Sequence, residues 1–248
     1  MADLAILPLG AVENVKLIGG KARVLSQLIR EGFIVPPGFV VTTAVFGQVD
    51  AELKAAILDN FDLLSSRTVA VRSSAVAEDG KNDAWAGQMD TFLKVNRKGL
   101  MVAIERCWAS ANSPRALAYA KQKGLKAGPV AVIVQKMIHG GTSGVAFSVH
   151  PITQAKDQMI IEAVPGLAES LVSGSATPDS YVIDKKTGKV IGEELRHRRA
   201  LLSAAQIHEL NRVICAMEKF FGLPIDVEWT LVKNKLFILQ SRPITTLG

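Results

Sequence analysis

The sequence predicts an α+β protein built from two lobes. Up to about Leu125, helical and strand-like segments alternate, whereas from Gly128 onward the pattern is mainly β. One long amphipathic helix is then expected before a closing pair of strands. We therefore expect a first lobe over residues 1–125 and a second lobe over residues 126–248, with a ligand in the cleft between the lobes.

The first lobe is expected to mix helices and strands. Its first helix follows the Gly19–Gly20 pair, because Ala22, Leu25 and Leu28 recur at helical spacing. Its last helix has Ser113 as a cap. The expected elements are a helix at Lys21–Glu31, a strand at Phe39–Val41, a helix running to Asn60 from a cap at Thr42 or Thr43, a strand at Thr68–Val71, a polar loop at Ser73–Gly87, a strand at Thr91–Val95, and helices at Leu100–Ala111 and Pro114–Lys123.

The second lobe is expected to be mostly strands. A single helix interrupts them, with Ser203 at its start as the capping residue. The expected elements are strands at Pro129–Met137, Val145–Val149, Gln158–Ala163 and Tyr181–Asp184, a hairpin through Lys186–Gly188 to Val190, a helix at Ala204–Phe221, and strands at Ile225–Trp229 and Leu236–Pro243.

Composition excludes several classes of protein. With 48% hydrophobic residues in 248, the chain is expected to be globular, and no apolar run reaches the roughly 18 residues of a membrane span. We expect a cytoplasmic protein. The two cysteines, Cys107 and Cys215, predict buried thiols rather than a disulfide framework. The net charge of +6 suits an anionic partner, but it is not concentrated in any block.

Polar side chains interrupt the apolar pattern of the last two strands. Side chains alternate across a strand, so Asp226 and Glu228 share one face, as do Gln240 and Arg242 on the returning strand. With a turn centred on Asn234, Glu228 lies opposite Gln240, and Asp226 lies opposite Arg242. Carboxylate and amide oxygens suit a hard divalent cation, and a guanidinium suits a polyphosphate. The pair predicts a magnesium-triphosphate platform; the alternative is a hairpin with one solvated polar face.

A second candidate cluster lies where an apolar strand meets the polar loop. Arg72 is followed there by the hydroxyls of Ser73 and Ser74, and binding groups are common at such junctions. Arg72 is suited to bind phosphate oxygens; the alternative is a structural salt bridge. Further on, the backbone amides near Gly87 are suited to approach a phosphate closely, although a simple turn explains that segment equally well.

Two more segments are candidates for nucleotide contacts. Lys21 stands at a helix start, where amides and the helix dipole favour an anion, but solvated lysines are also ordinary there. The strand end at Gln135–Met137 has a backbone that could pair with a flat base while Met137 packs on the face of the base. For each of these residues taken alone, core packing is the alternative.

Together these segments resemble one family. The chain is similar, over nearly its whole length, to the N-terminal ATP-binding domain of phosphoenolpyruvate synthase, pyruvate phosphate dikinase and rifampicin phosphotransferase. The resemblance implies an ATP-grasp fold, in which two α+β lobes hold Mg-ATP between them. The motifs that carry it are Gly19–Lys21, Val35–Phe39, Arg72–Ala75, Glu78–Asp79, Ala86–Gln88, Val134–Met137, Ser143–Val145, Thr177–Asp179, Asp226–Trp229 and Gln240–Pro243.

The resemblance also implies roles for individual residues. Glu228 and Gln240 are expected to bind Mg²⁺, and Gln135, Lys136 and Met137 to line the adenine. The expected phosphate contacts are Lys21, Arg72 and Arg242, the two arginines also acting in catalysis, with Gly87 and Thr91 in a loop that covers the phosphates.

The chain departs from the family pattern in two ways. Ala168 and Glu169 stand where relatives carry the Gly-Glu end of a Gly-Leu-Gly-Glu turn, which leaves the role of Glu169 open. None of the four histidines lies in a phosphorylatable-histidine motif. We therefore expect a dikinase-like phosphotransferase that passes the β-phosphoryl group of ATP to a histidine on a partner chain or separate domain, releasing AMP and phosphate, and that needs no base of its own.

Two alternative functions remain at this point. The chain could hold ATP without turnover, as a sensor or a regulatory subunit. A basic nucleic-acid-binding protein is a third hypothesis, suggested by a pI near 9.4, but neither a basic stripe nor interleaved aromatic residues supports it.

Overall fold

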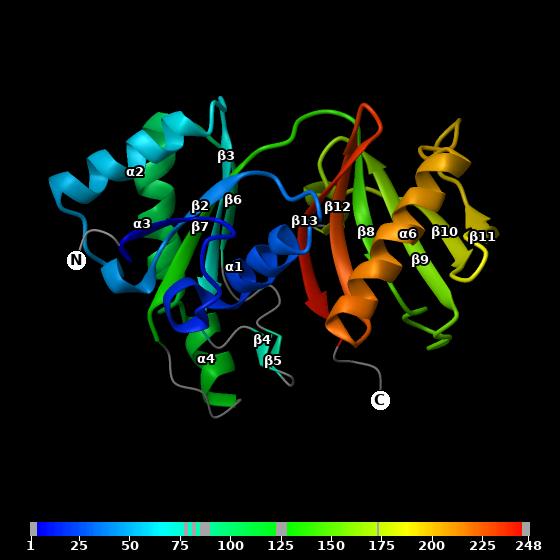
Figure 1. The fold of residues 1–248 in the computed structure, drawn as a ribbon, viewed down its shortest axis with the longest axis horizontal. Coiled ribbons are helices and arrows are strands. Elements are labelled where there is room, and N and C mark those ends of the chain that lie inside the picture. The colour runs from blue at the N-terminus through cyan, green and yellow to red at the C-terminus, as the bar shows by residue number, and fades with distance from the viewer. Residues whose placement is uncertain are drawn as a thin grey trace. The chain divides into compact units, whose positions relative to one another are not determined.

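The computed structural model in Figure 1 describes residues 4–76, 79–80, 83–84, 90–122, 128–172 and 174–244. The chain forms two compact units, Met1–Gly32 with Pro36–Met137, and Phe33–Val35 with Ile138–Gly248. Each unit has its own antiparallel sheet, so the expected α+β class is confirmed. We expected the first lobe to end at residue 125, whereas the first unit continues to Met137 because its central strand comes after that point.

The first unit is built on a five-stranded sheet with the order β1-β2-β7-β3-β6. Its strands are β1 (Ile6–Pro8), β2 (Gly38–Val41), β3 (Val69–Ala75), β6 (Thr91–Val95) and β7 (Val130–Lys136), and a separate small hairpin pairs β4 (Asp79–Gly80) with β5 (Asp83–Ala84). Its helices are α1 (Val15–Arg30), α2 (Ala51–Leu63), α3 (Leu100–Ser110) and α4 (Pro114–Gln122), with single 3-10 turns η2 (Thr43–Val45) and η3 (Arg97–Gly99).

Helices cover both faces of this sheet, so each polar residue of β3 faces one of two helix layers. One hydrophobic cluster joins α2 and α3 to the sheet through residues such as Ile57, Ile104 and Val132. Helix α1 packs on β3 and β7 with buried residues that lie outside this cluster. Because side chains alternate along a strand, Arg72 and Ser73 leave β3 on opposite faces.

Two expectations for the first unit need correction. Helix α1 begins at Val15, before the expected start, and kinks at Gly19, which has a φ of 73°. Helix α2 is capped by the side chain of Asp50 rather than by Thr42 or Thr43. The hydroxyl of Thr42 donates instead to the carbonyl of Leu4, so it is not available as a cap.

The second unit contains a six-stranded sheet with the order β11-β10-β9-β8-β12-β13. Its strands are β8 (Thr142–Phe147), β9 (Gln158–Pro165), β10 (Asp179–Asp184), β11 (Val190–Glu194), β12 (Ile225–Val232) and β13 (Lys235–Pro243), and its helices are α5 (Glu169–Val172) and α6 (Ala204–Phe221). Strand β8 begins three residues before the expected Val145. Helix α6, which lies across the sheet in Figure 1, has the expected bounds.

Strong signals at both ends explain why α6 was predicted well. Ser203 forms a capping box with Gln206, and Gly222 ends the helix in the left-handed conformation with a φ of 69°.

Among the helices in the described ranges, none is long and apolar enough to cross a membrane.

The hairpin of β12 and β13 has the expected pairing at the end that carries the polar residues. Asp226 pairs with Arg242, and Glu228 pairs with Gln240. The turn itself is a two-residue loop at Lys233–Asn234, whose φ values of 49° and 61° are typical of a tight hairpin. A β-bulge at Leu239 adds one residue to β13, so the pairs beyond it have the register that a longer turn centred on Asn234 would give.

Candidate functional site

The kink in α1 brings the helix into direct contact with β3. A Cβ atom on Gly19 would lie 2.1 Å from the carbonyl oxygen of Ser74, so a glycine is needed at this position. The next turn of the helix begins there, and the amide of Ala22 donates to the hydroxyl of Ser74 at 3.1 Å. The Lys21 ammonium donates to the carbonyl of Ser73 at 3.3 Å. The Gly19–Lys21 motif and the Arg72–Ala75 motif are therefore one local structure.

Three of the predicted phosphate-binding residues lie at this end of the first sheet. Arg72 pairs with Thr91 across β3 and β6, and Lys21 reaches the residue that follows Arg72. Arg72 is only 8% exposed, whereas Thr91 is exposed. A cation held in a poorly solvated position attracts an anion more strongly than the same cation in water does. Gly87, which was predicted together with Thr91 to cover the phosphates, lies outside the described residues.

The hydroxyls of Ser73 and Ser74, which the sequence suggested as binding groups, serve the fold. Ser74 caps the inner turn of α1, as described above. Ser73 contacts the carbonyl of Asp90 at 3.2 Å and the hydroxyl of Ser110 at 3.2 Å. These contacts tie Asp90, where the chain returns to the sheet, to the end of β3. Burial raises the pKa of the nearby Cys107 to about 12, which disfavours the thiolate form of this side chain.

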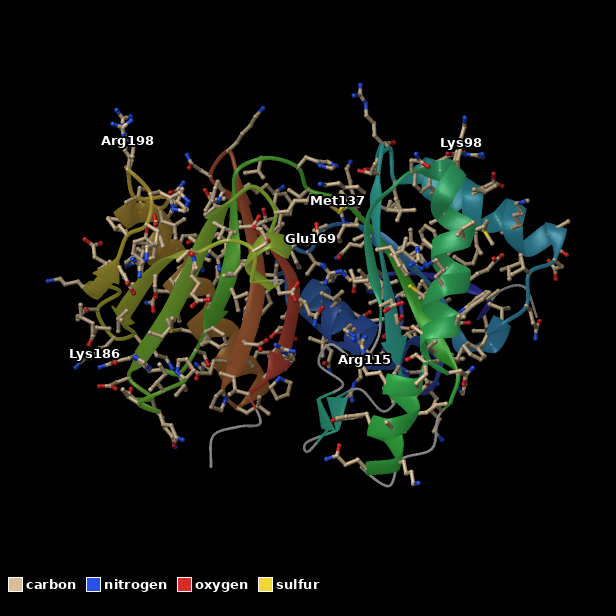
Figure 2. All side chains as sticks on the ribbon, turned by 180° about the vertical axis from the view of Figure 1, so that it is seen from behind. Lys98, Arg115, Met137, Glu169, Lys186 and Arg198 are labelled. Carbon is tan, nitrogen blue, oxygen red and sulfur yellow. The ribbon has the colours of Figure 1, made fainter. Side chains whose placement is uncertain are left out.

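The residues predicted to line the adenine end the central strand of the first unit. The amide of Lys136 donates to the carbonyl of Pro37 at 2.9 Å, and that of Met137 donates to Thr68 at 3.2 Å. Both amides are used because β7 pairs with β2 on one side and with β3 on the other. The amide donors of this strand end are thus engaged within the protein, and the predicted pairing of its backbone with a base would use the carbonyl groups. Gln135 is buried, and Met137, which is labelled in Figure 2, directly follows β7 and is also buried.

The side chain of Lys136 contacts a helix terminus. Its ammonium lies 3.4 Å from each of the carbonyl oxygens of Leu64 and Ser65, at the end of α2. A cation at the C-terminus of a helix interacts favourably with the helix dipole. This contact gives Lys136 a structural role in addition to the predicted role in binding.

In the second unit, Asp226 and Arg242 form an ion pair. The Nε of Arg242 donates to Oδ2 of Asp226 at 2.6 Å. Asp226 is buried, whereas the side chain of Arg242 is still 39% exposed. Burial raises the pKa of Asp226, and the neighbouring guanidinium opposes this rise. The pair anchors Arg242 at a strand end while its side chain stays accessible to solvent.

Glu228 and Gln240 lie next to this ion pair on the same face of the hairpin. They are directly paired across β12 and β13, and both are half-buried. Their neighbours Val227 and Trp229 point to the other face and are fully buried. A carboxylate and an amide oxygen on one surface fit a hard divalent cation such as Mg²⁺. The four polar residues of the predicted platform are therefore brought together.

Asp179 is a heavily hydrogen-bonded carboxylate of the second unit, whereas the sequence showed it only as part of the Thr177–Asp179 motif. Asp179 is fully buried and accepts from the amides of Arg196 at 2.7 Å and Leu201 at 3.1 Å, and it contacts Nδ1 of His197 at 2.9 Å. Burial opposes its ionisation, but these hydrogen bonds outweigh burial and hold its pKa below the usual range. Asp179 thereby fixes the loop that precedes α6, from which Arg198 projects (Figure 2).

Comparison with known proteins places the chain in a family. The sequence matches the model of the pyruvate phosphate dikinase AMP/ATP-binding domain over residues 45–200 and 193–248. The chain belongs to this family.

Several curated relatives align with nearly the whole chain. A probable phosphoenolpyruvate synthase of Methanothermobacter thermautotrophicus is 34% identical over 95% of this chain and 45% of its own length. The corresponding protein of Methanocaldococcus jannaschii is 30% identical over 95% of this chain and 26% of its own length. A rifampicin phosphotransferase of Bacillus cereus is 32% identical over 93% of this chain and 34% of its own length. The chain thus spans less than half the length of these relatives.

Among solved structures, the chain is similar to the D-alanine-D-alanine ligase of Helicobacter pylori. The match has a TM-score of 0.47 and 12% identity, and it covers 90% of this chain and 55% of the ligase.

Proposed function

We propose that this chain is the ATP-binding component of a phosphotransferase, and that it delivers a phosphoryl group from Mg-ATP to a histidine on another domain or partner chain. In the proposed reaction both anhydride bonds to the β-phosphorus of ATP break. The bond to the α-phosphate breaks as a bond from the β-phosphorus to a histidine nitrogen forms, and AMP leaves. One water molecule cleaves the bond to the γ-phosphate, and inorganic phosphate leaves. The pairing of Glu228 with Gln240 beside the Asp226–Arg242 ion pair carries the proposal, together with the family match.

The first unit supplies cations for this reaction. Arg72 is buried and Lys21 lies beside it, so both are suited to neutralise the charge of a triphosphate. Phosphoryl transfer depends on positioning and charge stabilisation more than on a base. Thr91 pairs with Arg72 and is exposed, which makes it suited to contact the same phosphates.

The second unit supplies the proposed metal ligands. Glu228 and Gln240 would hold Mg²⁺, which when bound neutralises phosphate charge and orients the triphosphate. Arg242 would contact the phosphates, and its ion pair with Asp226 holds it in position. None of these residues needs to accept a proton in the proposed reaction.

The proposal is tested by calorimetric titration of the chain with a non-hydrolysable ATP analogue, with and without Mg²⁺. We expect binding that depends on Mg²⁺ in the unchanged chain. Glu228→Gln removes the negative charge from the proposed metal ligand and is expected to weaken Mg²⁺-dependent binding about tenfold or more. Glu194→Gln, the same change at an exposed position on β11, is expected to have no effect. Equal binding by the Glu228→Gln variant and the unchanged chain would refute the metal assignment.

A second measurement addresses transfer. The chain is mixed with Mg-ATP and a histidine-bearing domain of a related phosphotransferase, and AMP and phosphohistidine are quantified. We expect AMP to form only when that domain is present. Tight ATP binding without AMP formation with any such domain would favour the sensor or regulatory alternative.

A further inference from the structure

Glu162 is a carboxylate that the fold does not use. It lies in the middle of β9 and is half-buried. Within the part of the chain that the structure describes, its carboxylate takes part in no hydrogen bond or ion pair, and burial alone raises its pKa. An acid held in this way costs the fold stability, because a partly desolvated charge has no compensating partner. Its position therefore suggests a role outside folding.

The strand registers place Glu162 on the same face as the proposed metal ligands. Gln240 pairs with Glu228, Glu228 pairs with Val145, and Val145 pairs with Glu162. Paired residues of an antiparallel sheet share a face, so these four side chains form one row. The neighbours of Glu162 along β9, such as Ile161, point to the other face and are buried.

The row also defines how far Glu162 lies from the proposed metal site. It is two strands away from Glu228, which corresponds to about 10 Å between Cα atoms at the usual strand spacing. Val145, which lies between them, contributes no ligand atom. No group of three acidic, histidine or cysteine side chains in the described ranges could hold a metal ion. A lone carboxylate at this distance is better suited to accept hydrogen bonds than to complete the cation site.

We propose that Glu162 accepts hydrogen bonds from the ribose hydroxyl groups of the bound nucleotide, an inference that rests on the proposed function. Along ATP, the ribose is the first hydroxyl-bearing group beyond the phosphates. A carboxylate has two oxygens that can accept from the neighbouring hydroxyls together. Hydroxyl groups supply the hydrogen bonds that this carboxylate lacks within the fold, which makes Glu162 a binding residue at the sugar.

The test compares two Mg²⁺-loaded, non-hydrolysable nucleotides that differ only in the ribose. One is the ATP analogue with both hydroxyls, and the other is its 2′,3′-dideoxy counterpart. Dissociation constants are measured by calorimetry for the unchanged chain and for the Glu162→Gln and Glu194→Gln variants. Glu162 pairs with Ser180, and Ser180 pairs with Glu194. Glu194 therefore lies at the far end of the same row, but it is exposed.

In the unchanged chain, removal of the hydroxyls is expected to weaken binding about tenfold, as for a charge-assisted hydrogen bond. The Glu162→Gln variant is expected to bind the hydroxyl-bearing analogue about tenfold more weakly than the unchanged chain does. It is expected to bind the dideoxy analogue with about the same affinity as the unchanged chain. Glu194→Gln is expected to retain the full preference for the hydroxyl-bearing analogue.

Three results would overturn the inference. If Glu162→Gln weakens both nucleotides equally, the residue acts on something other than the ribose. If it weakens neither, the residue does not contact the nucleotide. If the unchanged chain binds no nucleotide, the proposed function fails and the inference fails with it, whereas the first two results leave the proposed function standing.

Discussion

At the scale of single residues, Gly19 lies where the Gly19–Lys21 motif contacts the Arg72–Ala75 motif. Its φ of 73° and ψ of 172° lie in a region that is essentially restricted to glycine. A side chain there would also meet the backbone of Ser74. We expect Gly19→Ala to lower the free energy of unfolding by about 3 kcal/mol or more, measured by urea denaturation.

Gly32 provides a matched control for this change. It also has a positive φ, of 82°, but no atom lies within 4 Å of the position that its Cβ would occupy. Gly32→Ala should therefore cost only the backbone strain, about 1–2 kcal/mol. If the two variants are equally stable, the contact with Ser74 does not contribute to the need for glycine at position 19.

At the scale of elements, Asp179 joins the start of β10 to the loop that precedes α6. Asp179→Asn replaces one carboxylate oxygen by an NH2 donor, so the backbone amide of either Arg196 or Leu201 would lose its acceptor. We expect this change to lower the free energy of unfolding by about 3 kcal/mol at pH 7. Asp184→Asn, on the same strand but with an exposed contact to Thr187, should cost less than about 1 kcal/mol.

The effect of Asp179→Asn should depend on pH. Because the pKa of Asp179 is lower in the folded state than in the unfolded state, its stabilisation is present above the ordinary aspartate pKa of about 3.9. That stabilisation is lost as the pH falls through the lowered value. The difference in unfolding free energy between the unchanged chain and the variant should therefore shrink in acid. A difference that is constant from pH 7 to pH 3 would contradict this account.

Local signals in the sequence were enough to predict some elements. The bounds of α6 follow from its capping residues, and the shared face of Asp226 and Glu228 follows from the alternation of side chains. The pairing of Glu228 with Gln240 was expected from a turn centred on Asn234, whereas in the structure a shorter turn and the bulge at Leu239 together give this register. Other features depend on partners distant in sequence, which local patterns do not reveal. The donors of Lys136 and Met137 are engaged because β7 lies between β2 and β3.

Two errors have a similar origin. The hydroxyl of Thr42 looked like a helix cap, but it contacts the carbonyl of Leu4, near the start of the chain. Ser73 and Ser74 looked like binding groups at a strand end, yet they contact α3 and α1. Glu162 was passed over because a single acid in an apolar strand shows its significance only when the register with its neighbours is known.

At the scale of the whole molecule, the second unit takes in a segment from far earlier in the chain. Residues Phe33–Val35 belong to this unit, and the amide of Ile238 donates to the carbonyl of Ile34 at 2.8 Å. This segment covers part of the outer edge of β13, the last strand of its sheet. We expect a fragment of residues 138–248 to self-associate through that exposed edge, as measured by light scattering after gel filtration.

The control is the same fragment with residues 33–35 attached through a flexible linker. It should be less prone to associate than the fragment without the segment, because the edge is again covered. Equal association of both fragments would mean that the edge does not drive it.

The bulge at Leu239 separates the hairpin of β12 and β13 into two parts with different tolerance to change. Between the bulge and the turn, the gain or loss of one residue can be compensated by the gain or loss of a bulge. On the other side, the pairs of Asp226 with Arg242 and of Glu228 with Gln240 would then keep their register. The tip at Lys233–Asn234 is therefore a natural place to insert a label or an epitope without displacing these paired residues.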